Sequence, residues 1–268
     1  VAFLLLFPRD LRRYAYSLAS TTLFVSNFEF WRESGYFDTV VATKPLLYTW
    51  SLAVEEQFYV IYPAILWLCH KASRQRLVLI IAVILFASLG ESIWGIVHSP
   101  VSTFYLLPSR MWELMLGALL ALWKFPAPRN SLFSNLIAFA GLALIGFGIF
   151  AYNVNTPFPG WSAIPPCLGA AILIYSGSSS ASIVTKMLSA PTLVFFGLIS
   201  YSLYLWHWPL FVFATYIVGG ALPPALSAGL MALSVLMAWL SYRYVEQPFR
   251  GRKASFSRAG LFRLAALA

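Results

Sequence analysis

The sequence predicts an all-α protein, a polytopic bundle of helices that crosses a membrane several times. Its composition is the first reason: 60% of the 268 residues are hydrophobic and only 10% are charged, too few polar side chains to keep a globular surface in water. The second is the recurrence of apolar runs of about twenty residues, each long enough for a helix to cross a hydrocarbon layer of about 30 Å.

These apolar runs predict about seven full spans. Ahead of them, the run VAFLLLFP at residues 1–8 is interpreted as the outer end of a truncated helix. Residues 14–30 are interpreted as an interfacial or re-entrant segment, because hydroxyl and amide side chains interrupt them; one spanning helix is the alternative. Residues 259–268 begin a further truncated apolar segment. The spans are expected at residues 46–70, 77–97, 104–123, 131–151, 162–177, 193–218 and 222–245.

The distribution of Lys and Arg predicts the orientation of these spans. The formal charge is +9, and most basic residues follow the first, third, fifth and seventh spans, whereas residues 98–103, 152–161 and 219–221 contain none. Since cytoplasmic loops of membrane proteins are rich in Lys and Arg, we expect the basic loops in the cytoplasm and residue 46 outside. The positive charge therefore indicates no nucleic-acid partner.

Cysteine and glycine patterns exclude several kinds of site. Cys69 and Cys167 lie far apart with no second cysteine near either, so neither a CxxC redox motif nor a thiolate metal site can form. They are interpreted as packing residues. The sequence contains neither GxxxxGK[ST] nor GxGxxG, which excludes nucleotide-phosphate loops of those kinds. We expect no metal and no bound cofactor.

Two adjacent carboxylates, Glu55 and Glu56, are the most conspicuous polar residues. Glu55 lies about 13 Å below the outer end of its predicted span. A charge at the membrane centre costs about 2.5 to 3.5 kcal/mol on insertion scales, so such a residue indicates a functional site. Glu55 shares a helix face with Ser51 and Tyr59, whereas Glu56 is turned by about 100°. The pattern leaves open which of them faces a cavity.

Other ionisable residues are predicted at a similar depth. Arg110 and Glu113 are three residues apart on one helix face, and they form either a structural ion pair or part of a site. His207 is either a core histidine bonded to a helix carbonyl or a site residue. Glu91 is interpreted as reaching for the outer interface, and Trp208 as a packing residue.

Four strings, in this order and at these spacings, closely resemble the membrane-bound acyltransferase 3 family, the O-acetyltransferase-like proteins of bacterial envelopes. They are TWSLAVEEQFYVIYP, SRMWELMLGALLAL, GLISYSLYLWHWPLF and VEQPFR. The stretch at residues 7–38 also resembles the subgroup that acylates surface polysaccharides. The resemblance covers residues 1–258 and implies one transmembrane domain whose first two helices, and most of the third, would precede Val1.

The resemblance also implies roles for individual residues. The family's most characteristic catalytic element, a histidine in its first helix, has no counterpart among these residues, so this stretch alone is expected to be inactive. Supporting catalytic roles fall to Glu55, Glu56, Arg110, Glu113 and His207. Substrate-binding roles fall to Trp50, Ser51, Gln57, Tyr59, Trp112, Tyr201 and Tyr204.

The implied activity is O-acyl transfer in the bacterial inner membrane. An acyl group, usually acetyl, would pass from acetyl-CoA to a hydroxyl of an envelope polysaccharide or a lipid-linked sugar, such as the O-antigen of lipopolysaccharide. The partners would be the acyl-CoA donor, the carbohydrate acceptor and membrane lipid. From the residues alone, two rivals remain: a proton-coupled transporter or flippase that uses the carboxylates as a relay, and a non-catalytic scaffold or sensor.

Overall fold

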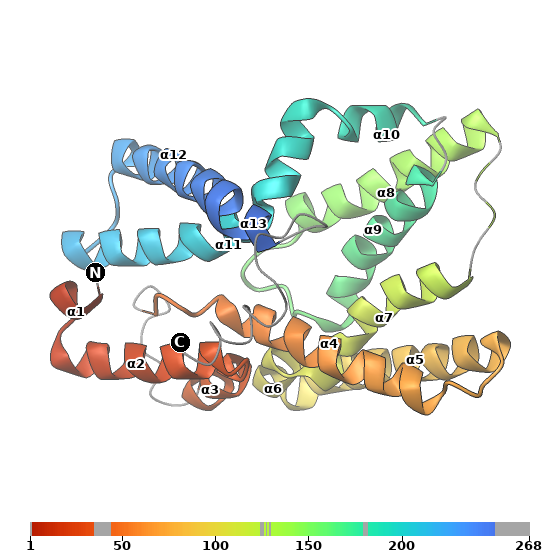
Figure 1. The fold of residues 1–268 in the computed structure, drawn as a ribbon, viewed down its shortest axis with the longest axis horizontal. Coiled ribbons are helices and arrows are strands. Elements are labelled where there is room, and N and C mark those ends of the chain that lie inside the picture. Colours follow the sequence, from red (N-terminus) through yellow and green to blue (C-terminus); the bar gives the residue numbers. More distant parts are fainter. Residues whose placement is uncertain are drawn as a thin grey trace. The chain divides into compact units, whose positions relative to one another are not determined.

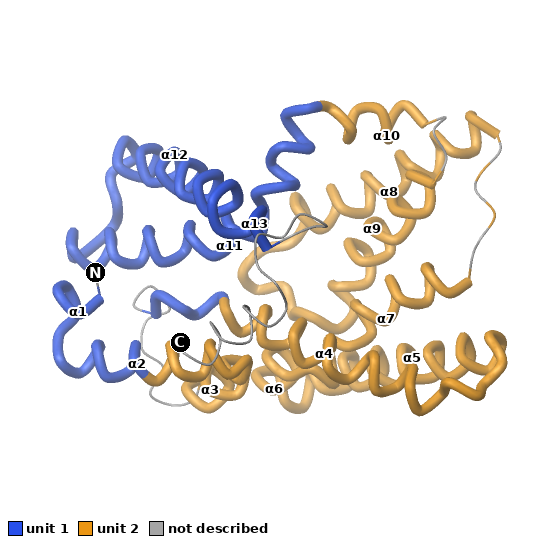
Figure 2. Tube along the Cα trace, in the orientation of Figure 1, with its two compact units in different colours: residues 1–15, 39–48, 191–268 blue, residues 16–38, 49–190 orange. Residues whose placement is uncertain are grey.

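The computed structural model describes residues 2–34, 44–123, 126, 128, 130–178 and 182–249. Within these ranges the regular structure is helical throughout and contains no β-strand (Figure 1), which confirms the all-α class. The chain divides into two compact units (Figure 2). Unit 1 comprises residues 1–15, 39–48 and 191–268, and unit 2 comprises residues 16–38 and 49–190.

Unit 1 is built around two long helices that pack against each other, α11 (Pro191–Val218) and α12 (Pro224–Ser241). The chain reverses between them at Gly219, whose φ of 72° lies in the left-handed region that glycine adopts without a steric penalty. Pro224 then starts α12, where the N–H that proline lacks would have no helical partner. A π-helical turn, η3 (Tyr242–Glu246), and the short α13 (Gln247–Phe249) follow.

The N-terminal end of unit 1 is tied to α11 by one tyrosine. α1 (Ala2–Leu5) leads into α2 (Pro8–Thr22), whose first residues belong to this unit. The Tyr216 hydroxyl accepts a hydrogen bond of 3.0 Å from the Phe7 amide and donates one of 3.1 Å to Asp10 Oδ2. The start of the chain therefore packs on the last turns of α11.

Unit 2 has its hydrophobic core between α4 (Thr49–Leu68), α5 (Arg74–His98) and α7 (Leu107–Trp123). The Ser73 side chain caps α5 by accepting from the Arg76 amide, which satisfies one of the free N–H groups at that end. A short helix, α6 (Pro100–Tyr105), links α5 to α7. The core consists of Val54, Phe58, Ile81, Leu85, Leu107, Trp112, Met115 and Ala163.

A second helix pair in unit 2, α8 (Ser131–Ala151) and α9 (Ile164–Gly177), packs at close range (Figure 1). Two buried glycines face each other across this pair: a β-carbon on Gly169 would lie 2.6 Å from the carbonyl oxygen of Gly141. Their missing side chains let the two backbones approach. A 3-10 turn, η2 (Gly160–Ala163), precedes α9, and α10 (Ile183–Leu188) follows it.

The segment predicted as interfacial or re-entrant is not one continuous helix. α2 ends at Thr22, Phe24 has a φ of 55°, and α3 (Ser26–Glu33) starts two residues later. Residues 14–30 thus do not form the single spanning helix that was the alternative.

Four of the seven predicted spans coincide with helices long and apolar enough to cross a membrane. They are α5, α8, α11 and α12 with its extension to Phe249. The spans predicted at 104–123 and 162–177 form α7 and α9, which have only 17 and 14 residues. The span predicted at 46–70 forms α4, which has 20 residues but is less apolar because it contains two carboxylates. The apolar segment predicted at 259–268 lies outside the described residues.

Candidate functional site

Arg110 and Glu113 form an ion pair on α7. Arg110 Nη1 donates to Glu113 Oε1 at 3.0 Å, and the two side chains are 9% and 25% exposed. A spacing of three residues places both on one helix face. The two side chains therefore pair with each other, as one of the two alternatives from the sequence expected.

Three aromatic rings surround the Arg110 guanidinium. Its carbon lies 5.2 Å from the ring centre of Trp50, 5.1 Å from that of Phe104 and 4.9 Å from that of Phe158. Nε also donates to the Phe104 carbonyl at 3.2 Å. Ring faces carry partial negative charge, so they compensate the cation for water lost on burial. Ion pair, carbonyl and rings together fix the Arg110 side chain.

A small cavity lies beside this ion pair. Its volume is about 110 Å³, which holds a few water molecules or a small polar group. Glu55 is exposed and lines this cavity, whereas the neighbouring Glu56 is half-buried and does not. The structure thus distinguishes two carboxylates that the sequence left equivalent. The lining is Trp50, Ser51, Val54, Glu55, Arg110, Glu113 and Leu114.

Gln57, which was predicted to contact substrate, forms side-chain hydrogen bonds with other residues of unit 2. Its Nε2 donates to Asn27 Oδ1 at 2.8 Å and to the Phe24 carbonyl at 2.9 Å. Asn27 Nδ2 donates in turn to Gln57 Oε1 at 3.4 Å and to the Tyr105 carbonyl at 3.3 Å. Both amides are thus used to join α3, α4 and α6. The role of Asn27 was not predicted from the sequence, because a lone asparagine carries no pattern that indicates its long-range contacts.

We expect Asn27→Ala to destabilise the protein by about 2 kcal/mol, because the Gln57 amide and the Tyr105 carbonyl lose a buried partner. Thermal unfolding in detergent measures this change. Asn155→Ala is the matched control: this exposed asparagine offers no side-chain bond, and its loss should leave the midpoint unchanged. Equal midpoints for the two variants would contradict the prediction.

The remaining predicted substrate residues of unit 2 occupy different environments. Trp50 and Ser51 line the cavity. Tyr59 is 57% exposed on α4. Trp112 is only 2% exposed and packs in the hydrophobic core.

His207 belongs to unit 1, where α11 holds it beside a larger cavity. Its Nδ1 lies 2.9 Å from the Leu203 carbonyl oxygen, and because a carbonyl oxygen can only accept, Nδ1 is the donor. This bond to a helix carbonyl was expected under one of the two alternatives that the sequence left open for His207. The cavity, about 810 Å³, lies between α11 and α12 and has mainly apolar walls. Ser200 and Tyr204 also line it, and Tyr201 is 42% exposed on the same helix.

The ionisable residues that were predicted at a similar membrane depth therefore belong to two different units. Glu55, Glu56, Arg110 and Glu113 belong to unit 2, and His207 belongs to unit 1. That all five side chains lie at one depth in the membrane remains a prediction.

Unit 1 contains a buried contact between a hydroxyl and a carboxylate that the sequence did not predict. Ser202 of α11, 1% exposed, donates its hydroxyl hydrogen to Glu246 Oε1 at the end of η3. Glu246 belongs to the string VEQPFR. A carboxylate directly after an apolar helix could have indicated that this side chain has a buried polar partner. The contact fixes the C-terminal turn against α11.

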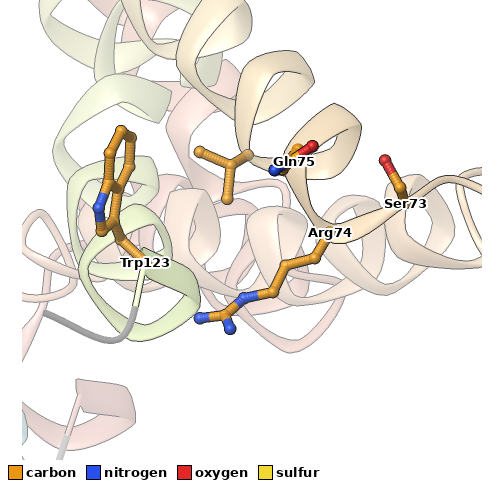
Figure 3. Close-up of a pocket in the computed structure, with 5 residues that line it drawn as sticks. Ser73, Arg74, Gln75 and Trp123 are labelled. Atoms are coloured by element: carbon orange, nitrogen blue, oxygen red, sulfur yellow. The ribbon is translucent and has the colours of Figure 1, made fainter.

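A third cavity lies at the helix ends of α5 and α7, away from the predicted residues. Its volume is about 600 Å³, and its lining includes Ser73, Arg74, Gln75 and Trp123 (Figure 3). The Arg74 guanidinium donates through both Nε and Nη2 to the Leu122 carbonyl in the last turn of α7. A cation there stabilises the negative end of the helix dipole, which gives Arg74 a structural role.

Metal binding finds no support in the described ranges, where no group of three or more His, Cys, Asp and Glu side chains is placed to hold an ion. Cys69 and Cys167 are both free thiols and partly buried. Cys167 packs against the core of unit 2.

Comparison with known proteins identifies the family. The sequence profile of the acyltransferase 3 family, described as an acyltransferase domain, matches residues 3–243. The chain belongs to the acyltransferase 3 family. The buried ion pair, the cavity with Glu55 and the His207 helix all lie within the matched acyltransferase domain.

Curated relatives of this acyltransferase 3 chain are transacylases or O-acetyltransferases by name. BcsY of Komagataeibacter xylinus, named as a membrane-bound transacylase, is 33% identical over 215 residues, which cover 80% of the chain and 53% of BcsY. The O-acetyltransferase OatA of Staphylococcus aureus is 29% identical over 245 residues, 85% of the chain and 40% of OatA. The peptidoglycan O-acetyltransferase OatA of Listeria monocytogenes is 30% identical over 261 residues, 91% of the chain and 41% of that protein.

The acyltransferase 3 chain spans about half the length, or less, of these relatives. No solved structure is significantly similar to it. The family and the membrane character are therefore established by sequence, and the site geometry comes from the structure described above.

Proposed function

We propose that this protein is an integral O-acyltransferase of the bacterial inner membrane. It transfers an acyl group, acetyl in the first instance, from acetyl-CoA to a hydroxyl of an envelope polysaccharide or a lipid-linked sugar such as that of O-antigen. The family membership and the relatives named as O-acetyltransferases support the reaction class. The four apolar helices support a membrane location.

The observation that carries the proposal is the cavity in which Glu55 meets the Arg110–Glu113 pair. A carboxylate orients a base or holds a proton, and a fixed guanidinium steadies developing negative charge on oxygen. Arg110 needs little reorganisation for this role, because its rings and its carbonyl partner already hold it. The cavity thus combines a proton acceptor with a preorganised cation.

In the proposed reaction, the C–S bond of the acetyl thioester breaks and an ester C–O bond forms. The acceptor's hydroxyl proton leaves through a base and reaches the thiolate, which departs as a free thiol. The family resemblance assigns the base, or transient acyl carrier, to a histidine of an upstream helix. Glu55 orients this histidine or holds its proton, with Glu56 as the alternative, and Arg110 steadies the thioester or phosphate oxygens.

The test uses the full-length protein with Glu55→Gln and Glu56→Gln as separate variants. We expect Glu55→Gln to lower acetylation of the envelope glycan by at least about tenfold, and Glu56→Gln to lower it less, because only Glu55 lines the cavity. Mass spectrometry of the glycans, with and without the gene, detects the added acetyl mass.

Glu91→Gln is the matched control, since Glu91 is exposed on α5 and lies outside the cavity lining. Undiminished acetylation in both Glu55→Gln and Glu56→Gln, at normal expression, would end the catalytic proposal. If the protein were a transporter, Pro63 and Pro209 would mark the breaks of discontinuous helices. Because α4 and α11 continue through these prolines, the structure offers this rival no support.

A further inference from the structure

A short segment of unit 1, residues 44–48, is held along α11 by two side chains. Trp208 Nε1 donates to the Lys44 carbonyl at 2.9 Å. The Tyr204 hydroxyl donates to the Tyr48 carbonyl at 2.6 Å. The two hydrogen bonds are accepted by the first and the last residue of the segment. Both donors lie on one face of α11, because they are four residues apart.

The ring of Tyr48 strengthens this attachment. It stacks on Trp208 with ring centres 4.3 Å apart and planes 21° apart. Its centre also lies 6.0 Å from that of Tyr204, nearly parallel, and 5.5 Å from that of His207. The segment itself is a turn, in which the Leu47 amide donates to the Lys44 carbonyl at 3.2 Å. One carbonyl thus closes the turn and accepts from Trp208.

This attachment lies directly before the helix that carries the proposed site. Tyr48 is the last residue of the segment, and Thr49 is the first residue of α4. Glu55 follows less than two turns later. The carbonyl that Tyr204 holds therefore belongs to the peptide bond from which α4 starts.

We propose that Tyr204 and Trp208 are positioning residues that clamp residues 44–48, the segment of unit 1 that leads into α4. This differs from the expectation that Tyr204 contacts substrate. The clamp itself rests on the contacts within unit 1, and its consequence for catalysis rests on the proposed acyl transfer.

Hydrogen–deuterium exchange of the full-length protein in detergent, read by mass spectrometry on peptides that cover residues 44–50, tests the clamp. Tyr204→Phe and Trp208→Phe each remove one donor and keep a ring. We expect the Leu47 amide to exchange roughly three- to tenfold faster in either variant, because one hydrogen bond no longer holds the turn closed. Tyr244→Phe and Trp239→Phe, exposed residues of the same unit, are matched controls and should leave this peptide unchanged.

Acetylation kinetics then separate positioning from substrate contact. A positioning role predicts a lower kcat for Tyr204→Phe with an unchanged KM for the acceptor, together with the faster exchange. Unchanged exchange with a raised acceptor KM would overturn the proposal in favour of direct substrate binding, and faster exchange throughout α11 and α12 would overturn it in favour of general loosening. If the wild-type protein proves unable to acetylate, the proposed function fails while the exchange result still decides the clamp.

Discussion

Replacing Arg110 by methionine is expected to lower the free energy of unfolding by about 3 to 5 kcal/mol, which is the usual cost of removing one partner of a buried ion pair. The change leaves the Glu113 carboxylate without its cation and the Phe104 carbonyl without its donor. It also leaves three ring faces packed against a neutral side chain. Chemical or thermal unfolding in detergent measures the loss.

Two further variants separate charge from packing. Arg110→Met combined with Glu113→Met should be less destabilised than Arg110→Met alone, because no unpaired charge remains. Arg110→Lys should fall between the wild type and Arg110→Met, since it keeps the charge and loses the planar fork that reaches Glu113 and Phe104 together. Arg76→Met is the control, because Arg76 is exposed and its loss should change stability by less than about 0.5 kcal/mol. A double variant as unstable as the single one would argue against this account.

Gly169→Val is expected to be nearly as damaging, with a loss of about 3 kcal/mol or more. A β-carbon at residue 169 would lie 2.6 Å from the Gly141 carbonyl oxygen and 2.9 Å from Ile145 Cγ1. The first of these atoms is backbone, so α8 and α9 must separate along their contact to relieve the clash. Gly169→Ala should show a smaller loss of the same sign.

Gly146 of α8 supplies the control for this prediction. Apart from the local backbone of α8, no atom lies within 4 Å of a β-carbon built there. Gly146→Ala should therefore leave the free energy of unfolding unchanged or raise it by up to about 1 kcal/mol, the gain in helix propensity. Unfolding of the variants in detergent decides the matter. If Gly169→Val were as stable as the wild type, the close approach of the two backbones would be incorrect.

The sequence predicted the features that depend on neighbours along one helix. The spacing of Arg110 and Glu113 is a local property, and so is the apolar composition of α5, α8, α11 and α12. Four of the seven spans predicted from hydropathy coincide with helices long and apolar enough to cross a membrane, and hydropathy does not show where helices end. The run at 104–123, for example, is divided at Leu106, whose backbone is extended.

Features made by residues far apart in the chain were beyond such reasoning. The rings around Arg110 come from α4, α6 and the segment before η2, and nothing in the local pattern of Phe104 or Phe158 marks them as its partners. The same holds for Gly141 with Gly169 and for Tyr48 with Trp208. Which carboxylate faces the cavity also depends on how α4 packs against α7, so it required the structure.

The bond between the Phe7 amide and Tyr216 joins residues 209 positions apart, and this separation has a consequence for synthesis. At a ribosomal rate of roughly 5 to 20 residues per second, the N-terminal helices wait on the order of ten seconds or more before α11 exists. During that interval the Phe7 amide and the Asp10 carboxylate lack the Tyr216 hydroxyl that they later bond. Unit 1, whose first and last residues bracket unit 2, is therefore the part of the protein that matures last.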